Sequence, residues 1–276
     1  MSSRSTDAVY ERYLASPPEV YERHFVPSIG MTSAAPVLEA ARLCPGERVL
    51  DLACGTGLVA RLAAEKVGPS GSVTGTDIHP AMVEVARATS PGAPEVEWHV
   101  APAEDLPLPD ASFDAVLCSL ALQFFPDKVA ALEEVRRVLA PGGRVAIGTP
   151  GPIPPLMADL HEVIDRHLGA EAAGFVHAVF TLHDPAEVEK LLTAAGFAEV
   201  EAEHRALPVR LDGPANFLWQ YLQGTPLAMA VAEIDHDARI ALELETVERW
   251  QRYVDGDGMA MDPGLVVATA RRVGKS

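Results

Sequence analysis

The stretch Val49-Leu50-Asp51-Leu52-Ala53-Cys54-Gly55-Thr56-Gly57-Leu58 decides the fold of this 276-residue chain. The apolar run at residues 48–52 is typical of a buried strand, and it leads through a glycine turn into a helical pattern over residues 58–66. Glycine permits positive φ and lets a ligand approach the backbone where a Cβ would block it. A strand, a glycine turn and a helix in this order are typical of nucleotide-binding α/β sheets, although the turn alone is weak evidence.

The segments that surround this stretch alternate between strand and helix patterns. The expected strands cover residues 48–52, 72–77, 96–100, 113–119 and 143–149, and the expected helices cover 58–66, 80–88 and 128–139. Strands and helices that alternate with short connections predict an α/β fold with a parallel, doubly wound sheet.

Three parts of the chain differ in pattern: residues 1–44, 45–150 and 151–276. The first is an amphipathic, tyrosine-rich leader, whose helices we expect to break at Pro17-Pro18, Pro27 and Pro36. The second is the α/β core. The third holds two strands, near residues 198–207 and 263–272, and they are separated by a largely helical insertion at 210–262. Insertions of this kind lie beside the carboxyl edge of an open sheet, where ligands bind, so the leader and the insertion predict a helical roof over a pocket.

Charge and cysteine content narrow the class of protein. A net charge of −17 argues against nucleic acid or an anionic membrane as a partner. No apolar run reaches the 18 or more residues of a membrane span, and the first residues lack the apolar core of a signal peptide. Cys44, Cys54 and Cys118 are widely spaced and odd in number, so we expect neither a disulfide framework nor a metal site. The cytoplasm is the expected location.

Two carboxylates indicate which nucleotide the glycine turn serves. Asp77 ends the strand at 72–77, where a carboxylate can accept hydrogen bonds from a ribose diol in NAD-binding and adenosylmethionine-binding folds alike. Asp51 lies just before the turn, and an anion there would repel a pyrophosphate at the helix N-terminus. It would favour the cationic amine and sulfonium of adenosylmethionine. No lysine follows the glycines, so a Walker-type phosphate loop is excluded.

The stretch from Asp51 to Gly57 resembles the first motif of the class I S-adenosylmethionine-dependent methyltransferases. It is most similar to their small-molecule group, which includes the quinone-biosynthesis C-methyltransferases. The likeness continues in order through Val73-Thr74-Gly75-Thr76-Asp77-Ile78 with Met82, Ala103-Glu104-Asp105-Leu106-Pro107, Ser112-Phe113-Asp114, Ser119-Leu120-Ala121-Leu122-Gln123-Phe124 and Leu139-Ala140-Pro141-Gly142-Gly143. It implies a mostly parallel, seven-stranded Rossmann-like sheet, S-adenosylmethionine as cofactor, and in-line transfer of its methyl group to a small organic molecule.

The resemblance also implies which positions hold the cofactor. They are Asp51 at the methionine amine, Ala53 in place of a first glycine, Gly55 and Gly57 beneath the methionine and ribose, Asp77 at the ribose hydroxyls, Ile78 and Met82 beside the adenine, Ala103 and Glu104 at its amino edge, and Ser119 at the methionine backbone. The chain departs from the family pattern at Ala53 and at Pro102, where many members have glycine and aspartate.

Methyl transfer requires alignment of the nucleophile, methyl and sulfur, and needs a general base only when the nucleophile is protonated and weakly acidic. The sequence therefore names no catalytic residue, and His24, Tyr21 and His177 are weak candidates for a base. The expected roof carries bulky apolar and aromatic side chains: Phe175, Phe180, Phe217, Trp219, Tyr221, Met229, Trp250 and Tyr253. They suit a small organic acceptor. A helical mini-core or a contact between two copies of the chain is the alternative for much of this set.

Two other functions remain open at this point. One is an NAD-dependent oxidoreductase on a related sheet, against which Asp51 and the segment at 103–107 count. The other is a protein that binds S-adenosylmethionine for a structural, regulatory or non-methylating role, since the sequence shows no clear base.

Overall fold

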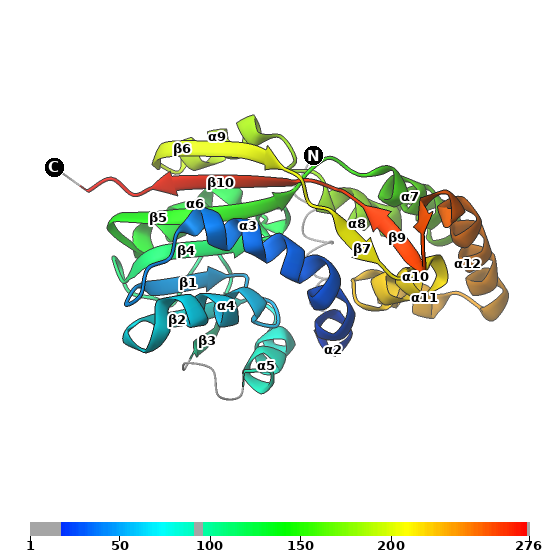
Figure 1. Ribbon diagram of the computed structural model, residues 1–276, viewed down its shortest axis with the longest axis horizontal. Coiled ribbons are helices and arrows are strands. Elements are labelled where there is room, and N and C mark those ends of the chain that lie inside the picture. Colours follow the sequence, from blue (N-terminus) through cyan, green and yellow to red (C-terminus); the bar gives the residue numbers. More distant parts are fainter. Residues whose placement is uncertain (1–17, 91–95, 275–276) are drawn as a thin grey trace.

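A seven-stranded sheet forms the centre of the computed structural model, which describes residues 18–90 and 96–274 (Figure 1). Its strands are β1 (Arg48–Leu52), β2 (Ser72–Asp77), β3 (Val96–Val100), β4 (Phe113–Ser119), β5 (Leu139–Pro150), β6 (Ala198–Arg205) and β10 (Leu265–Arg271). They lie in the order β3-β2-β1-β4-β5-β10-β6, and β10 is antiparallel to both of its neighbours. The predicted doubly wound, mostly parallel, seven-stranded sheet is therefore confirmed.

Helices cover both faces of this sheet. Met31–Ala41 (α3), Leu58–Val67 (α4) and Pro80–Ala88 (α5) pack on one face, and Lys128–Val138 (α6) and Pro185–Ala194 (α9) pack on the other. Because both faces are covered, β1 and β4 are buried runs rather than alternating ones. The aspartates that precede α6 and α9 cap them by accepting hydrogen bonds from backbone N–H groups. Within the described ranges, no helix combines the length and hydropathy that a membrane span requires.

The insertion between β6 and β10 forms much of the predicted roof. Arg205 at the end of β6 pairs with Leu265 at the start of β10, and Leu265 also pairs with Pro150 at the end of β5, so the chain leaves and re-enters at the carboxyl edge. The roof consists of α7 (Pro155–Leu168), α8 (Ala170–Val179), α10 (Pro214–Gln223), α11 (Leu227–Glu233) and α12 (His236–Trp250), and it gathers at one end of the molecule (Figure 1).

A second, small sheet stands beside these helices and was not expected from the sequence. It consists of β7 (Val209–Leu211), β9 (Gly258–Met261) and β8 (Val254–Asp255), in the order β7-β9-β8. The short 3₁₀ helices are η2 (Gly68–Ser70), η3 (Leu122–Phe124) and η4 (Gln251–Tyr253).

The prediction that Pro27 and Pro36 break the leader is wrong. Helical structure runs continuously through α2 (Pro18–Val20), the π-helical segment η1 (Tyr21–Gly30) and α3, with Pro27 inside η1 and Pro36 inside α3. A helix tolerates proline where wider turns and side-chain hydroxyls satisfy its backbone. Here the N–H of Met31 bonds to the carbonyl of Val26, and the Ser28 hydroxyl donates to the carbonyl of His24 at 2.7 Å. Residues 1–17, which include Tyr10, Tyr13 and Pro17, lie outside the described residues.

Candidate functional site

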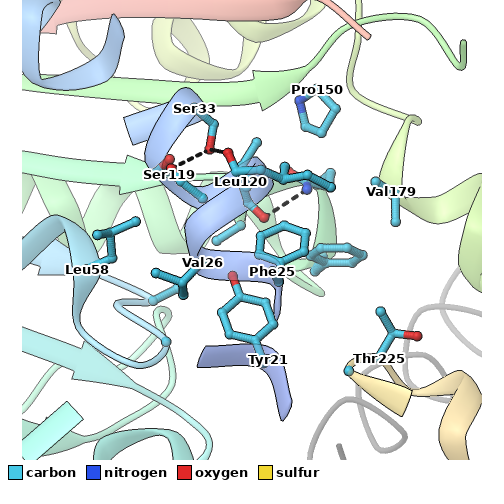
Figure 2. A pocket seen from close by; sticks show the side chains of 18 of the residues that line it. Tyr21, Phe25, Val26, Ser33, Leu58, Ser119, Leu120, Pro150, Val179 and Thr225 are labelled. Atoms are coloured by element: carbon cyan, nitrogen blue, oxygen red, sulfur yellow. Dashed lines mark hydrogen bonds between the residues drawn. The ribbon is translucent and has the colours of Figure 1, made fainter. Parts of the chain in front are cut away.

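A cavity of about 190 Å³ lies at the carboxyl edge of the sheet, between the loops that follow the strands and the helical roof. Its floor comes from the loops after β1, β2 and β4, one side comes from η1, and the far side comes from the roof (Figure 2). The cavity therefore joins the glycine turn to the insertion that the sequence places above it.

Asp77 organises the glycine turn from the end of β2. Its carboxylate is 2% exposed and accepts the backbone N–H of Gly55 and the backbone N–H of His79, each at 2.8 Å. These two bonds hold the loops after β1 and β2 together. Burial raises the pKa of Asp77, and the hydrogen bonds from His79 and Gly55 oppose that rise.

The two positions of the turn, 55 and 57, require glycine for different reasons. Gly55 has φ +53°, and a Cβ built on it would meet nothing closer than the Tyr21 ring at 3.9 Å, so its backbone is open to the cavity. Gly57 has φ +85°, and a Cβ there would lie 2.5 Å from the Trp98 ring and 3.1 Å from Ala86. Gly57 does not line the cavity. Its small size serves the packing of α4 against the sheet.

Asp51 brings a second buried carboxylate to the cavity. Its side chain is 1% exposed, and its Oδ2 has no hydrogen-bond partner within residues 18–90 and 96–274. Burial raises the pKa of Asp51 to about 8, so the carboxyl group is largely protonated near neutral pH when no cation lies beside it. Burial likewise raises the pKa of the nearby Cys54 and Cys118 thiols, which makes both poor nucleophiles.

The leader forms a wall directly above the glycine turn. Tyr21 and Phe25 stack with ring centroids 4.6 Å apart, and both line the cavity (Figure 2). Arg61 of α4 donates to the carbonyl of Thr56 at 2.7 Å and forms an ion pair with Glu22 at 3.1 Å, which ties η1 to the loop. The structure thus closes this side of the cavity with aromatic rings.

The three candidate bases lie in different places. Burial, followed by the charge of Asp77, raises the pKa of Tyr21 above its usual value, so Tyr21 is a neutral hydrogen-bond donor rather than a base. His24 lines a separate, smaller pocket between η1 and α10. His177 is exposed on α8, away from the cavity, with its ring against His161. Among the described residues, no histidine, lysine, arginine or glutamate lines the cavity.

The predicted cofactor positions divide into two groups. Those that line the cavity are Asp51, Ala53, Gly55, Asp77, Ile78 and Ser119. Those that do not are Gly57, Met82, Ala103 and Glu104. Met82 is fully buried in α5, and Glu104 accepts the N–H of Asp127 at 3.4 Å.

Backbone strain marks two loops that line the cavity. Ala53 after β1 has φ +55° and Leu120 after β4 has φ +57°, values that cost a non-glycine residue of the order of 1–3 kcal/mol. The N–H of Leu120 is held by the carbonyl of Gly148 at 2.7 Å. Ala53 accordingly has a left-handed conformation that glycine would adopt without this cost.

The cavity is lined by one aromatic residue that the sequence did not place in the roof, Phe124, and by one that it did, Phe175. Phe124 after β4 and Phe175 of α8 stack in parallel, with centroids 6.2 Å apart. Of the roof side chains singled out from the sequence, Phe175, Phe180 and Tyr221 line the cavity. Phe217 and Trp250 instead pack together at 5.6 Å in a helical core, as the alternative interpretation expected for part of the set.

Other cavity residues come from the loop after β4 and from the leader, including Gln123, Val26 and Ser33. Gln123 could have been identified from the sequence as a cavity residue, because it is a polar residue in an otherwise apolar run directly after a strand.

Comparison with known proteins places this geometry in a family. A family model described as a methyltransferase domain matches residues 50–147. The nocamycin O-methyltransferase of Saccharothrix syringae is 34% identical over 220 residues, which cover 72% of this chain and 77% of that protein. The 2-phytyl-1,4-naphthoquinone methyltransferase of Synechococcus elongatus is 41% identical over 134 residues, covering 47% and 58% of the two chains.

A solved structure shows the same fold over nearly the whole chain. The phosphoethanolamine N-methyltransferase 2 of Haemonchus contortus, in complex with phosphomonomethylethanolamine and S-adenosylhomocysteine, matches 93% of this chain and 57% of that chain. The TM-score is 0.59 at 21% sequence identity.

The fold, the site and these relatives define a methyltransferase. The chain belongs to the class I S-adenosylmethionine-dependent methyltransferases, and S-adenosylmethionine is its cofactor. The predicted family, fold and cofactor are confirmed, and nothing among the relatives favours the oxidoreductase alternative.

Proposed function

We propose that the protein transfers the methyl group of S-adenosylmethionine to a small, largely apolar organic acceptor held beneath the roof. One observation carries this proposal: a single cavity joins the Asp51 and Asp77 loops to a wall of aromatic side chains. Such linings suit organic molecules with ring or chain surface. The names of the two relatives, a nocamycin O-methyltransferase and a 2-phytyl-1,4-naphthoquinone methyltransferase, support an acceptor of this kind.

The residues at the glycine turn fit the cofactor. The unpartnered, buried Oδ2 of Asp51 suits the cationic amino-acid end of S-adenosylmethionine, and the open backbone of Gly55 allows close approach. Each carboxylate oxygen of Asp77 accepts a hydrogen bond from a backbone N–H group and has a further lone pair for a ribose hydroxyl. Ala53, Ile78 and Ser119 complete the proposed cofactor surface.

The protein's contribution to the reaction is to align the reactants and exclude water. S-adenosylmethionine supplies a methyl group activated by its sulfonium, and the cofactor thereby carries the difficult chemistry. Tyr21 and Phe25 close the cavity on the leader side, and Phe124 and Phe175 line it farther along the chain. Because no strong base lines the described part of the cavity, the site suits an acceptor whose attacking atom is nucleophilic without deprotonation by a side chain.

Ligand binding tests the proposal first. S-adenosylhomocysteine at 100 times its Kd should stabilise the protein by about 2.7 kcal/mol, which raises Tm by roughly 5–10 °C. NADH is the control, and it should leave Tm unchanged. Methyl-labelled S-adenosylmethionine and cell extract should then give a labelled small molecule by mass spectrometry. Absence of S-adenosylhomocysteine binding at millimolar concentration contradicts the proposal, and binding without any labelled product favours a non-methylating role.

The pKa of Asp51 gives a second test, through pH. A cation beside the carboxylate favours its ionised form, so ligand binding below pH 8 should release a proton from Asp51. We expect the affinity for S-adenosylhomocysteine to rise about tenfold or more between pH 6.0 and 7.5, measured by calorimetry in two buffers of different ionisation heat. Asp51→Asn should bind more weakly and show a flat profile. An equally flat wild-type profile would rule out this role.

The same pKa predicts the direction of a stability change. The folded-state pKa of Asp51 lies above its unfolded value, so the folded protein binds the extra proton and loses stability as pH rises from about 4 to about 8. In the Asp51→Asn variant, this fall in the free energy of unfolding with rising pH should be absent.

We infer a reducing, cytoplasmic location and a single small-molecule partner. All three cysteines are unpaired, and Cys44 is exposed, which suits a reducing compartment. The net charge of −17 disfavours nucleic acid as the acceptor. Ile240 and Leu244 are large apolar side chains exposed on α12. This surface is the candidate contact between two copies of the chain.

A further inference from the structure

Two buried polar atoms that line the cavity have no hydrogen-bond partner among the described residues. They are the hydroxyl of Tyr221 on α10 and the Oε1 of Gln123 on η3. The side chains are 8% and 5% exposed, and both line the cavity. A buried polar group without a partner destabilises a protein, and such groups are rare in folded structures, so each calls for an explanation.

The chemistry of each atom is fixed by its surroundings. Burial raises the pKa of Tyr221, which keeps the phenol neutral and leaves its O–H available as a donor. The Nε2 of Gln123 donates to the carbonyl of Leu120 at 2.9 Å, so the atom without a partner is the amide oxygen, an acceptor. The cavity thus offers one donor and one acceptor within an apolar, aromatic wall.

The charges around the cavity select against an ionised ligand. Its carboxylates, Asp51 and Asp77, lie at the cofactor half, and among the described residues no basic side chain lines it. An anionic acceptor would lose its hydration without gaining a basic side chain as counter-ion. Phe124 and Phe175, whose rings are parallel, both line the cavity and give it an aromatic lining that suits a ring.

We infer that the acceptor is an uncharged, hydroxyl-bearing aromatic molecule, a phenol or an enol, that accepts a hydrogen bond from Tyr221 and donates one to Gln123. This inference rests on the proposed function, since it names the acceptor class of the same cavity. The two residues are acceptor-binding groups, and both lie outside the surface proposed for the cofactor.

Three naphthalene probes of equal ring size test the inference. 1-Naphthol, 1-naphthoate and 1-naphthylmethylammonium differ in charge, and each is titrated by calorimetry into the full-length protein saturated with S-adenosylhomocysteine. We expect 1-naphthol to bind at least tenfold more tightly than either ion. Tyr221→Phe and Gln123→Met should each weaken 1-naphthol about 3–10-fold, the loss typical of one neutral hydrogen bond. Neither should change the Kd of S-adenosylhomocysteine by more than about twofold.

Tyr253→Phe is the matched control, since its hydroxyl donates to Asp159 at 3.0 Å and the residue does not line the cavity. It should leave 1-naphthol binding unchanged. Without ligand, Tyr221→Phe should raise Tm by about 2 °C because it removes an unpartnered hydroxyl, whereas Tyr253→Phe should not raise it.

Two results would overturn the inference: 1-naphthol binding no tighter than 1-naphthoate, or equal 1-naphthol affinity in Tyr221→Phe and the wild type. Failure of S-adenosylhomocysteine itself to bind would instead contradict the proposed function, so the two failures are distinguishable.

Discussion

Replacing Asp77 with alanine is expected to weaken S-adenosylhomocysteine binding by at least 100-fold and to abolish the Tm rise that the ligand gives the wild type. Asp77 is proposed to accept hydrogen bonds from the ribose hydroxyls, and hydrogen bonds to a charged group contribute about 1.5–3 kcal/mol each. Two such bonds correspond to roughly two to four orders of magnitude in Kd. The substitution also removes the acceptor of the Gly55 and His79 N–H groups, which shape the turn. Isothermal calorimetry measures the loss.

Folding has to be separated from binding in this experiment. Asp77→Ala leaves two buried N–H groups without a partner, at about 1–3 kcal/mol each, partly offset because a buried carboxylate disappears. Asp77→Asn keeps the size and one acceptor oxygen and should fold better while still binding weakly. Asp114→Asn is the control, since Asp114 pairs with Arg48 at the opposite end of β4 and should leave ligand affinity unchanged. Wild-type affinity in Asp77→Ala would refute the proposed role.

The fold of residues 45–150 could be predicted because its information is local. Each strand there is a short run of strand-forming residues bounded by turn residues, and two helices have a start signal, Pro80 at the first position of α5 and Asp127 before α6. The meeting of Asp77 with Gly55 follows from topology, because parallel neighbouring strands end at the same edge of the sheet. Local pattern and chain topology together therefore predict that the Asp51, Gly55 and Asp77 loops meet at one end of the cavity.

The leader and the roof could not be predicted to the same depth, because their structure depends on distant contacts. Pro27 reads as a helix breaker in sequence, yet hydroxyl hydrogen bonds and wide π-helical turns carry the helix past it. The strand Gly258–Met261 is stabilised by pairing with Val209–Leu211, which lies far away in the chain. Gln123 and Tyr221 meet the same cavity from a loop and from the insertion, and no short sequence window contains both.

The different roles of the two glycines in the motif could not be predicted from the sequence either. In the sequence, Gly55 and Gly57 belong to one motif, which suggests that ligand binding requires both glycines. In the structure Gly55 opens onto the cavity, whereas Gly57 lies against Trp98, a residue of β3 that belongs to no motif. Trp98 packs equally closely on Gly75, at 2.5 Å from a Cβ built there. A large ring in this position requires two glycines beneath it.

Gly57→Ala is therefore expected to destabilise the protein by about 3–4 kcal/mol, through its positive φ and through overpacking against Trp98 and Ala86. The corresponding fall in Tm is roughly 6–15 °C, measured by calorimetry or thermal denaturation. Gly142→Ala is the matched control: its φ is +82°, close to the +85° of Gly57, but a Cβ there meets nothing within 4 Å. It isolates the backbone cost, about 1–2 kcal/mol, and the difference between the two variants is the cost of the clash.

A double-mutant cycle with Trp98→Leu identifies the neighbour responsible. The smaller side chain removes the ring that the new Cβ would strike, so Gly57→Ala should cost about 1–3 kcal/mol less in the Trp98→Leu background than in the wild type. Equal costs in the two backgrounds, or equal effects of Gly57→Ala and Gly142→Ala, would show that packing against Trp98 is not what requires glycine at position 57. The requirement would then return to the ligand, and the loss would be found in the Kd of S-adenosylhomocysteine rather than in the free energy of unfolding.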